Sequence, residues 1–496
     1  MSSLPRLDAF VDGRRLAPLS GEYFETVNPY TGKAWAEVAR CGAEEAALAV
    51  TAAARAFDSG PWSRMTPTQR GALLRRLGDL LAGHAEELAA IEVRDNGKLI
   101  SEMGGQCAYI PEWYYYFGGL ADKMEGAVIP IDKPDVFNFT VHEPLGVVVA
   151  ITPWNSPLLL LSFKLAPALA AGNTVVIKPS EFTSASTLRF AELVAQAGFP
   201  PGVVNVVTGY GNEVGAALVE HSQVAAVAFT GGSDSGARVY AAAARHLKRC
   251  TLELGGKSPN IVFDDADLEG AVKGAISGIF AATGQTCIAG SRLLVQDGIY
   301  DAFVSRLVEF ARGARMGDPM DRATQVGPVT TPPQYAKVLE YIDIAKREGA
   351  EVLLGGGPAA RPECGESPWF IEPTIFGGVA NSMRIAQEEV FGPVLSLIRF
   401  KTDDDAIAIA NDIAFGLAAG VWTQSIRRAL KVSKAVRAGT VWVNTYRAVS
   451  FMSPFGGYKK SGIGRENGIE SMREFTQTKS VWISTADDVP NPFVMR

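Results

Sequence analysis

The hydrophobic and polar positions of this 496-residue chain follow two rhythms, which change at Gly146. Before it, "GAEEAALAVTAAARAFD" and "TQRGALLRRLGDLLAGHAEELAAIEVRDNGK" carry apolar residues at spacings of three and four, which predicts amphipathic helices. Residues 127–146 are rich in Pro and β-branched side chains, which predicts extended strands. The first part of the chain is therefore expected to be helical and to end in a β segment outside the main rhythm.

After Gly146, short apolar segments alternate with helical ones. Strands are predicted at 146–152, 173–179, 202–209, 224–231 and 249–256, and helices at 158–171, 183–197, 212–221 and 234–247. Strands that are apolar throughout are buried on both faces, and alternation with helices predicts a parallel, doubly wound sheet. Such sheets bind ligands at the carboxyl ends of their strands.

A second alternation begins at the "LGGKS" turn, near 255–257. Its strands are predicted at 258–263, 291–296, 394–400, 418–423 and 439–444, and its helices at 267–282, 299–314 and 333–348. Near the C-terminus, "REFTQTKSVWIS" predicts a further strand. That strand could pair with residues 127–143 or with another subunit.

Composition and charge narrow the classes of function. An apolar content of 47% and a net charge of −6, without a concentrated basic run, give no indication of a nucleic-acid or membrane partner. Five scattered cysteines and four histidines lack the C-x-x-C and H-E-x-x-H spacings, so neither a disulfide framework nor a metal site is predicted. No signal peptide is evident, and the most apolar segment, "PLLLLSFKLAPALAAG", is too short and interrupted to span a bilayer. The cytoplasm is the expected location.

Several predicted strands end in turns that could carry chemistry. Asn155 in "PWNSP" is either a turn residue that bonds its own backbone or a fixed amide donor for an oxyanion. Lys178 and Glu181 in "KPSE" are either a solvated ion pair or a binding site for a ribose. Glu253 in "LELGGKS" either pairs with a cation or, with a pKa raised by apolar surroundings, acts as a general base.

Glycine-rich stretches and one cysteine complete the candidates. "TGYGNEVG" and "TGGSDSG" do not fit G-x-G-x-x-G, but the second places bare backbone at a helix N-terminus, where a phosphate could bind. Cys287 in "GQTCIAGSR" has no histidine nearby in the sequence and is either an inert buried thiol or a nucleophile. Residues 453–468 predict a long glycine-rich loop, consistent with the wall of a cleft.

Taken in order, "PWNSP", "KPSE", "FTGGSDSG", "LELGGKSPNIV", "GQTCIAGSR", "EEVFGPV", "AGTVWVN" and "SPFGGYKKSG" resemble the motif series of the NAD(P)-dependent, non-phosphorylating aldehyde dehydrogenase superfamily. The resemblance covers residues from about 10 to 485. It implies an α/β fold with two doubly wound domains, Rossmann-like for the cofactor and catalytic for the aldehyde, plus a small β oligomerisation arm. The implied ranges are 1–124 and 145–255 for the cofactor domain, 256–465 for the catalytic domain, and 125–144 and 466–496 for the arm.

The resemblance also implies a reaction. Cys287 would attack the aldehyde, Asn155 and the Cys287 N–H would hold the oxyanion, and Glu253 would activate the water that hydrolyses the thioester. The implied cofactor contacts are Thr152, Trp154, Lys178, Ser180, Glu181, Gly211, Gly215, Phe229, Gly231, Gly232, Ser233, Leu254, Glu389 and Phe391. The cofactor is expected to be NAD, with NADP possible, because Glu181 would accept from a ribose 2′-OH and repel a 2′-phosphate.

For the substrate, the resemblance implies a tunnel lined by Trp113, Phe163, Thr286, Ile288, Arg447, Val449 and Phe455. The expected substrate is a medium-sized apolar or aromatic aldehyde. Arg447 either meets an anionic tail or is a solvated residue at the rim, and Arg347 stands where many members carry a glutamine near the nicotinamide ribose. Alternatives are a relative that passes the thioester to coenzyme A and a catalytically silent protein on this fold. A homodimer or homotetramer is expected.

Overall fold

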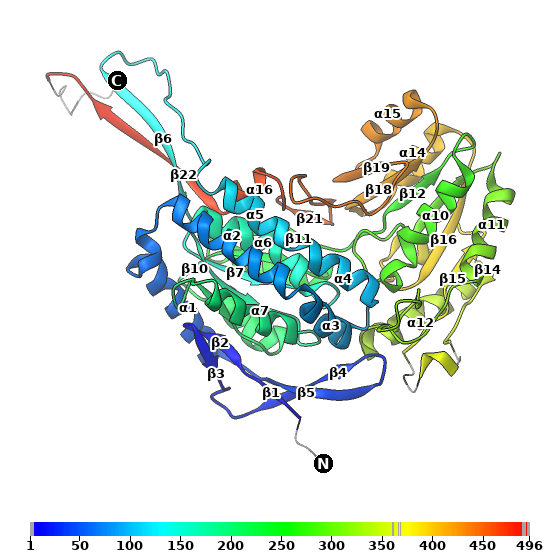
Figure 1. Cartoon of the computed structure of the whole chain (residues 1–496). Helices are drawn as coiled ribbons and strands as arrows, with labels where there is room; N and C mark the ends of the chain where they lie inside the picture. Colours follow the sequence, from blue (N-terminus) through cyan, green and yellow to red (C-terminus); the bar gives the residue numbers. More distant parts are fainter. Residues whose placement is uncertain (1–3, 360–361, 366, 368, 489–492, 494–496) are drawn as a thin grey trace.

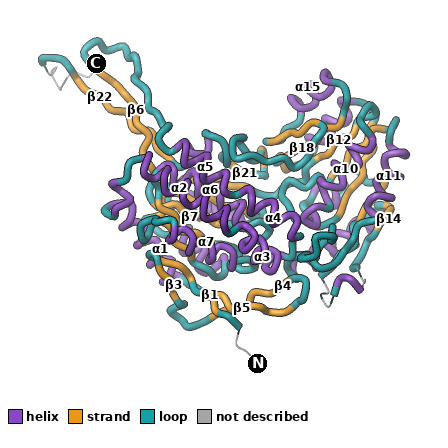
Figure 2. Tube along the Cα trace, viewed as in Figure 1, coloured by secondary structure: helices purple, strands orange, loops and turns teal. Residues whose placement is uncertain are grey.

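The computed structural model describes residues 4–359, 362–365, 367, 369–488 and 493. Two large sheets, each covered by helices, make up the body, and a two-stranded ribbon projects from one end (Figure 1). Figure 2 shows the helices gathered around the strands of both sheets. Smaller sheets join these parts at the edges. The α/β class implied by the sequence is therefore confirmed.

The first large sheet has a parallel centre with antiparallel edges. Its order is β21 (Gly462–Ile463), β11 (Arg249–Glu253), β10 (Val224–Thr230), β7 (Val147–Ile151), β8 (Thr174–Lys178), β9 (Val204–Val206), β2 (Ala9–Val11) and β3 (Arg14–Leu16). The five strands predicted from apolar runs form its centre. This part of the prediction is confirmed.

Helices cover both faces of this sheet. One face carries α1 (Ala43–Asp58), α8 (Ala216–Glu220) and α9 (Ser233–Ala244), and the other carries α2 (Pro67–Gly83), α5 (Pro111–Leu120), α6 (Pro157–Ala171) and α7 (Ala185–Gln196). α3 (Ala85–Asn96) and α4 (Ile100–Tyr109) pack on each other beside the second group. Along β7, Val147 and Val149 enter the core with α1, whereas Val148 and Ala150 enter the core with α6. Burial on both faces explains the continuous apolar run.

The second large sheet is parallel except for one edge strand. Its order is β14 (Glu351–Leu354), β15 (Thr374–Gly377), β16 (Val394–Phe400), β13 (Arg292–Gln296), β12 (Pro259–Val262), β18 (Ala418–Trp422) and β19 (Thr440–Val443). One face carries α10 (Leu268–Ile279) and α11 (Tyr300–Arg312), and the other carries α12 (Pro332–Arg347), α13 (Arg384–Gln387), α14 (Asp403–Asn411) and α15 (Ile426–Ala435). The predicted strands and helices of this unit are confirmed, whereas β14, β15 and α13–α15 were not predicted.

The projecting ribbon consists of β6 (Val136–Pro144) and β22 (Thr476–Ser484), which pair antiparallel along their whole length. α16 (Glu470–Glu474) leads into β22. Pairing of the C-terminal segment with the region 127–143 is thus confirmed. Residues 127–135 are not a strand, and of these Val128 alone makes a β-bridge, to Phe139. Pro130 and Pro134 lack the N–H that a ladder needs.

The helices predicted in the first part of the chain are confirmed: residues 42–58 contain α1, and residues 68–98 contain most of α2 and all of α3. These two helices are separated at His84, whose ring nitrogen bonds the Leu80 carbonyl at 2.8 Å. Other local features were not predicted. The loop 453–468 contains β20 (Tyr458–Lys459), paired with β17 (Phe415–Gly416), as well as β21. The N-terminal strands were not predicted. β1 (Arg6–Leu7) is too short to show a periodicity, whereas β4 (Tyr23–Asn28) and β5 (Lys33–Ala39), which form a separate sheet with it, are six and seven residues long. Single turns lie at η1 (Pro61–Arg64), η2 (Gly211–Gly215), η3 (Ala281–Gly284) and η4 (Pro362–Cys364).

Candidate active site

Four of the turns singled out in the sequence meet at one edge of the first sheet. The strands β7, β8, β10 and β11 are adjacent and parallel, so their carboxyl ends lie together. Asn155 follows β7, Lys178 ends β8, Gly231 follows β10, and Glu253 ends β11. The fold therefore brings together side chains that are far apart in the sequence.

A cleft of about 520 Å³ lies at this edge. Most residues predicted to contact the cofactor line it: Thr152, Trp154, Lys178, Ser180, Glu181, Gly211, Gly215, Phe229, Gly231 and Gly232. The other four, Ser233, Leu254, Glu389 and Phe391, are not in its lining. Arg238 on α9 also lines the cleft, and sequence reasoning missed it.

The cleft depends on positions without a Cβ. A Cβ on Gly231 would lie 2.6 Å from the Phe229 ring, and one on Gly236 would lie 2.3 Å from the Leu254 side chain. The turn at 231–233 leads directly into α9, whose N-terminus suits a phosphate. The Thr152 hydroxyl is buried and has no hydrogen-bond partner among the described residues. These features fit a dinucleotide.

The Lys178–Glu181 pair lies inside this cleft. Lys178 Nζ and Glu181 Oε2 are 3.3 Å apart. Lys178 is buried, and this burial lowers the pKa of its ammonium group although Glu181 acts in the opposite direction. The interpretation as a solvated pair is therefore wrong for Lys178, and a partly exposed carboxylate is left at the cleft wall for a ribose hydroxyl.

Glu389 and Phe391 form a separate loop beside the sheet edge. Glu389 Oε1 accepts from the Gly256 N–H at 3.0 Å, and burial raises the pKa of the Glu389 carboxyl. A Cβ on Gly255 would lie 2.4 Å from Glu389 Oε2, so a side chain there would displace the Glu389 carboxylate. Phe391 has a φ of 60° and packs edge-on against Trp154, with ring centroids 5.3 Å apart. This loop is thus tied to the turn that carries Asn155.

Cys287 follows a strained turn. Ala282 and Thr283 have φ of 54° and 53°, a conformation that costs energy in residues other than glycine. Gly284 has a φ of 67°, and a Cβ there would lie 2.0 Å from the Gly392 carbonyl oxygen. The close approach locks the cysteine segment against the loop of Glu389. Strain of this kind is typical of functional sites.

The Cys287 thiol is half-buried and favours its protonated form. Burial, followed by the negative charges of Glu253 and Glu389, raises the pKa of the thiol to about 12. The Ile288 N–H and Lys98 act in the opposite direction without reversing the shift. A base is therefore needed to produce the thiolate.

Asn155 is buried next to the cysteine segment. Its Nδ2 donates to the Gln285 carbonyl at 3.0 Å, which orients the amide. The amide carries a second N–H, and the backbone N–H of Cys287 has no acceptor among the described residues. Asn155 and Cys287 line the same cavity, so two donors are available where an oxyanion would form.

Glu253 is a buried carboxylate without a hydrogen-bond partner among the described residues. Burial and the neighbouring Glu466 raise the pKa of Glu253 well above its ordinary value. Glu466 forms a buried ion pair with Lys164, which also donates to the Thr230 hydroxyl at 2.5 Å. The cation thus pairs directly with Glu466, and Glu253 is left as a carboxylate of raised pKa, as the general-base hypothesis expects.

A second cavity, of about 710 Å³, has Cys287 in its wall. All the residues predicted for the substrate tunnel line it: Trp113, Phe163, Thr286, Ile288, Arg447, Val449 and Phe455. Trp113 stacks on Phe163 with centroids 5.1 Å apart, and Phe455 packs edge-on against Phe163. One wall is therefore aromatic.

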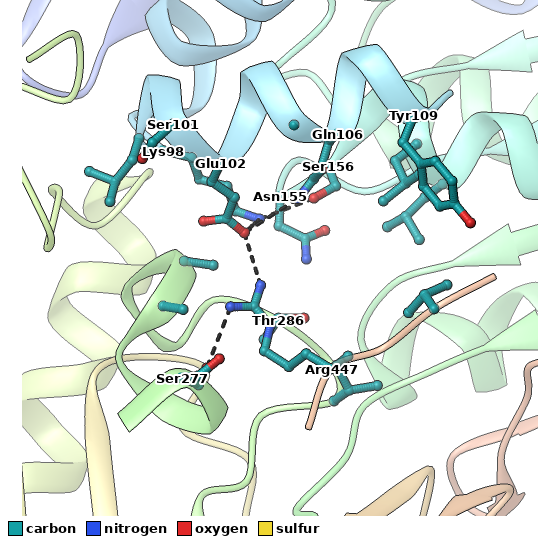
Figure 3. A pocket seen from close by; sticks show the side chains of 18 of the residues that line it. Lys98, Ser101, Glu102, Gln106, Tyr109, Asn155, Ser156, Ser277, Thr286 and Arg447 are labelled. Atoms are coloured by element: carbon teal, nitrogen blue, oxygen red, sulfur yellow. Dashed lines mark hydrogen bonds and ion pairs between the residues drawn. The ribbon is translucent and has the colours of Figure 1, made fainter. Parts of the chain in front are cut away.

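Another part of the wall is polar, and its residues on α4 were not predicted. α4 contributes Glu102, Gln106 and Tyr109, which share one helical face, and Lys98 precedes this helix (Figure 3). Arg447 points from the other side toward Glu102 (Figure 3). The spacings of four and three between Glu102, Gln106 and Tyr109 are a weak indication that these residues share one helical face. Arg447, which bonds Glu102 on this face, lies far away in the sequence.

Two predictions about arginines were wrong. Arg447 is not a solvated rim residue, because its Nη2 donates to Glu102 Oε1 at 2.9 Å and its side chain is 19% exposed. Arg347 is exposed at the C-terminal end of α12. The same helix carries Gln334 near its start, and Gln334 Nε2 donates to the Val390 and Phe391 carbonyls in the loop of Glu389. Sequence reasoning also missed Lys164. A charged residue within the apolar helix α6 could have drawn attention to it.

Among the described residues, no helix is long and apolar enough to cross a membrane. In the same part of the chain, no three His, Cys, Asp or Glu residues gather in a way that could hold a metal ion.

Comparison with known proteins agrees with this geometry. The model of the aldehyde dehydrogenase family matches residues 17–481. A (Z)-2-((N-methylformamido)methylene)-5-hydroxybutyrolactone dehydrogenase from Acinetobacter baylyi is 47% identical over 95% of this chain and 96% of its own, and the human mitochondrial aldehyde dehydrogenase is 46% identical over 96% and 91%. A crystal structure of betaine aldehyde dehydrogenase from Staphylococcus aureus with NAD+ has a TM-score of 0.97 and 41% identity, and covers 99% of this chain and 97% of that one. The chain belongs to the aldehyde dehydrogenase family and oxidises aldehydes with NAD+.

Proposed function

We propose that this chain oxidises an aldehyde to its acid through a covalent intermediate on Cys287, with Asn155 and Glu253 as its catalytic partners. The observation that carries the proposal is that Cys287 and Asn155 line one cavity, and that Asn155 and Glu253 follow or end strands at the same edge of the first sheet. These three residues come from different segments of the chain.

The first step is addition of the thiol to the aldehyde. A base takes the Cys287 proton, the sulfur–carbon bond forms, and the carbonyl oxygen becomes an oxyanion. The second N–H of Asn155 and the N–H of Cys287 stabilise the oxyanion, and removing one such donor typically reduces kcat by about 100-fold to 1,000-fold.

The cleft positions the cofactor for the oxidation. NAD+, when bound, accepts the hydride that leaves the substrate carbon, and a thioester remains on Cys287. Glu181 would bind a ribose hydroxyl, the turn at 231–233 would hold the pyrophosphate, and Glu389 would bind the nicotinamide ribose. NAD is the preferred cofactor, and Lys178 beside Glu181 leaves room for some use of NADP.

The last step is hydrolysis of the thioester. Glu253 has no hydrogen-bond partner among the described residues, so neither of its oxygens is engaged by a protein donor, and it would act as the base that deprotonates the water molecule. The Lys164–Glu466 pair fixes the charge beside it. A member that passed the acyl group to coenzyme A would not need this base, so Glu253 favours hydrolysis. A catalytically silent protein would not need the three residues together.

The substrate is a medium-sized aldehyde with an apolar or aromatic part. The stacked Trp113 and Phe163, with Phe455 at their edge, provide a matching wall in a cavity of about 710 Å³.

The test of the proposed function is a screen of aldehydes with NAD+ and with NADP+, with and without coenzyme A, in which reduced cofactor and free acid are both measured. Acid formation independent of coenzyme A is expected. Acyl-coenzyme A as the product, or no turnover, would contradict the proposal.

We also propose that the ribbon of β6 and β22 joins protomers into a homodimer or homotetramer. It projects from the body (Figure 1) and exposes large apolar side chains: Phe137, Trp482 and Ile483. Such side chains mark interaction surfaces. The domain ranges 1–124 with 145–255, 256–465, and 125–144 with 466–496 remain part of this proposal. The cytoplasm also remains part of it, and it suits a sequence whose scattered cysteines show no C-x-x-C spacing.

A further inference from the structure

The polar wall of the aldehyde cavity is built around one ion pair. Glu102 Oε1 accepts from Arg447 Nη2 at 2.9 Å and from Gln106 Nε2 at 3.3 Å, and Lys98 Nζ lies 3.9 Å away (Figure 3). The Glu102 and Arg447 side chains are 15% and 19% exposed. Burial alone would raise the pKa of Glu102, but Lys98 and Arg447 outweigh it and lower that pKa. The carboxylate is therefore ionised and its charge is compensated.

Arg447 is held in place and still has donors to offer. Its φ of 64° is a strained conformation, which persists where the surroundings fix it. Besides Glu102, its guanidinium reaches only the Ser277 carbonyl, at 3.4 Å, among the described residues. A guanidinium carries five N–H donors, so some donors of Arg447 remain unused, and Arg447 lines the cavity.

An unused acceptor lies next to these donors. Gln106 Oε1 is buried and has no hydrogen-bond partner among the described residues. Since a buried polar atom without a partner is costly, a ligand that donates to it would be favoured. The wall thus presents donors and an acceptor on neighbouring side chains.

The charged groups of this wall are paired, buried or screened by solvent. Arg447 is paired with Glu102, and Lys98 is buried and donates to the Ser156 hydroxyl at 3.0 Å. Arg322 also lines the cavity, but it is exposed, and solvent and salt screen its charge. A ligand carboxylate would have to compete with Glu102 for Arg447.

We propose that the enzyme selects aldehydes that carry an uncharged polar group with both an acceptor and a donor, such as a carboxamide, and that Glu102 excludes carboxylates. The carbonyl of this group would accept from Arg447 and its N–H would donate to Gln106 Oε1. This inference rests on the proposed function, since it assigns the substrate class of the same cavity.

The test uses three straight-chain aldehydes of equal length that end in a carboxamide, a carboxylate or a methyl group, each at several chain lengths with NAD+. The kcat/KM of the carboxamide is expected to exceed that of the other two by about tenfold at its best length, the gain expected for one hydrogen bond to a charged group. Glu102→Gln frees Arg447 for an anion, so the carboxylate-to-carboxamide ratio of kcat/KM should rise about tenfold.

A second variant and a control complete the design. Gln106→Met removes the acceptor and should lower the carboxamide-to-methyl ratio about threefold, as expected for a neutral hydrogen bond. The exposed pair Arg306–Glu269 on α11 and α10 provides the control, because Glu269→Gln should leave both ratios unchanged. NAD+ binding measured on each variant reports whether it has folded.

The outcomes are distinct. Equal kcat/KM for the three tails, or ratios that neither Glu102→Gln nor Gln106→Met changes, would overturn this inference and leave the proposed function standing. If the wild-type chain oxidises none of the aldehydes of the wider screen, the proposed function fails and this inference fails with it.

Discussion

The cofactor cleft and the aldehyde cavity are built from different kinds of group. The cleft is made by consecutive strand ends of one sheet, and its shape depends on backbone and on missing side chains, as at Gly231 and Gly236. The cavity is made by side chains from α4, α6, the Cys287 segment and the loop after β19, and its polar wall depends on pairs such as Glu102–Arg447. Under the proposed assignment of these cavities, binding of the cofactor is a property of the sheet, whereas choice of the aldehyde is a property of side chains packed across the molecule.

The largest expected effect separates chemistry from cofactor binding. Cys287→Ala should reduce turnover by at least about 1,000-fold, because the variant has no nucleophile. Its affinity for NAD+, measured by calorimetry, should change less than about twofold, since the sulfur does not line the cofactor cleft. Full turnover in this variant would refute covalent catalysis.

Glu253→Gln tests the buried carboxylate. The steady-state rate should fall by about 100-fold or more, because the amide can no longer take a proton from water. If Glu253 acts mainly in hydrolysis, a rapid burst of NADH should still precede the slow steady state in stopped-flow absorbance. A steady-state rate within twofold of the wild type would remove Glu253 from the mechanism.

The raised pKa of Cys287 predicts the pH dependence of its reactivity. In the enzyme without cofactor, the rate of alkylation by iodoacetamide should rise about tenfold per unit from about pH 7 to about pH 10, because the thiolate fraction grows in that way below the pKa. The alkylation rate is expected to rise with pH because the pKa of the Cys287 thiol lies above the pH range tested. Cys287→Ala gives the background from the other thiols. A rate that is independent of pH in this range would mean that the thiolate already predominates.

Gly255→Ala should affect the cofactor side selectively. The new Cβ would displace the Glu389 carboxylate, so KM for NAD+ should rise about tenfold while KM for the aldehyde changes little. Gly83→Ala at the end of α2 is the matched control, since nothing lies within 4 Å of its added Cβ and it lines neither cavity, and it should change KM for NAD+ less than about twofold. Equal effects of the two variants would mean that space at Gly255 does not determine cofactor binding.

The same contrast explains what the sequence could predict. Strands such as β7 and β8 were predicted because each is apolar throughout, and the turns after them carry their chemistry within a few residues. Lys164 pairs with Glu466 across 302 positions and Glu102 with Arg447 across 345, and no local pattern identifies such partners. Short strands such as β1 and β20 were missed because two residues contain no periodicity.

The most direct test of covalent catalysis is mass spectrometry of Glu253→Gln after a brief reaction with NAD+ and an aldehyde that the wild-type enzyme oxidises. Slow hydrolysis should leave the acyl group on the protein. The peptide that contains Cys287 is predicted to gain the mass of the aldehyde less two hydrogens, because addition of the thiol and loss of a hydride and a proton leave a thioester. Formation of NADH with an unmodified Cys287 peptide, or with the acyl group on another residue, would contradict the account.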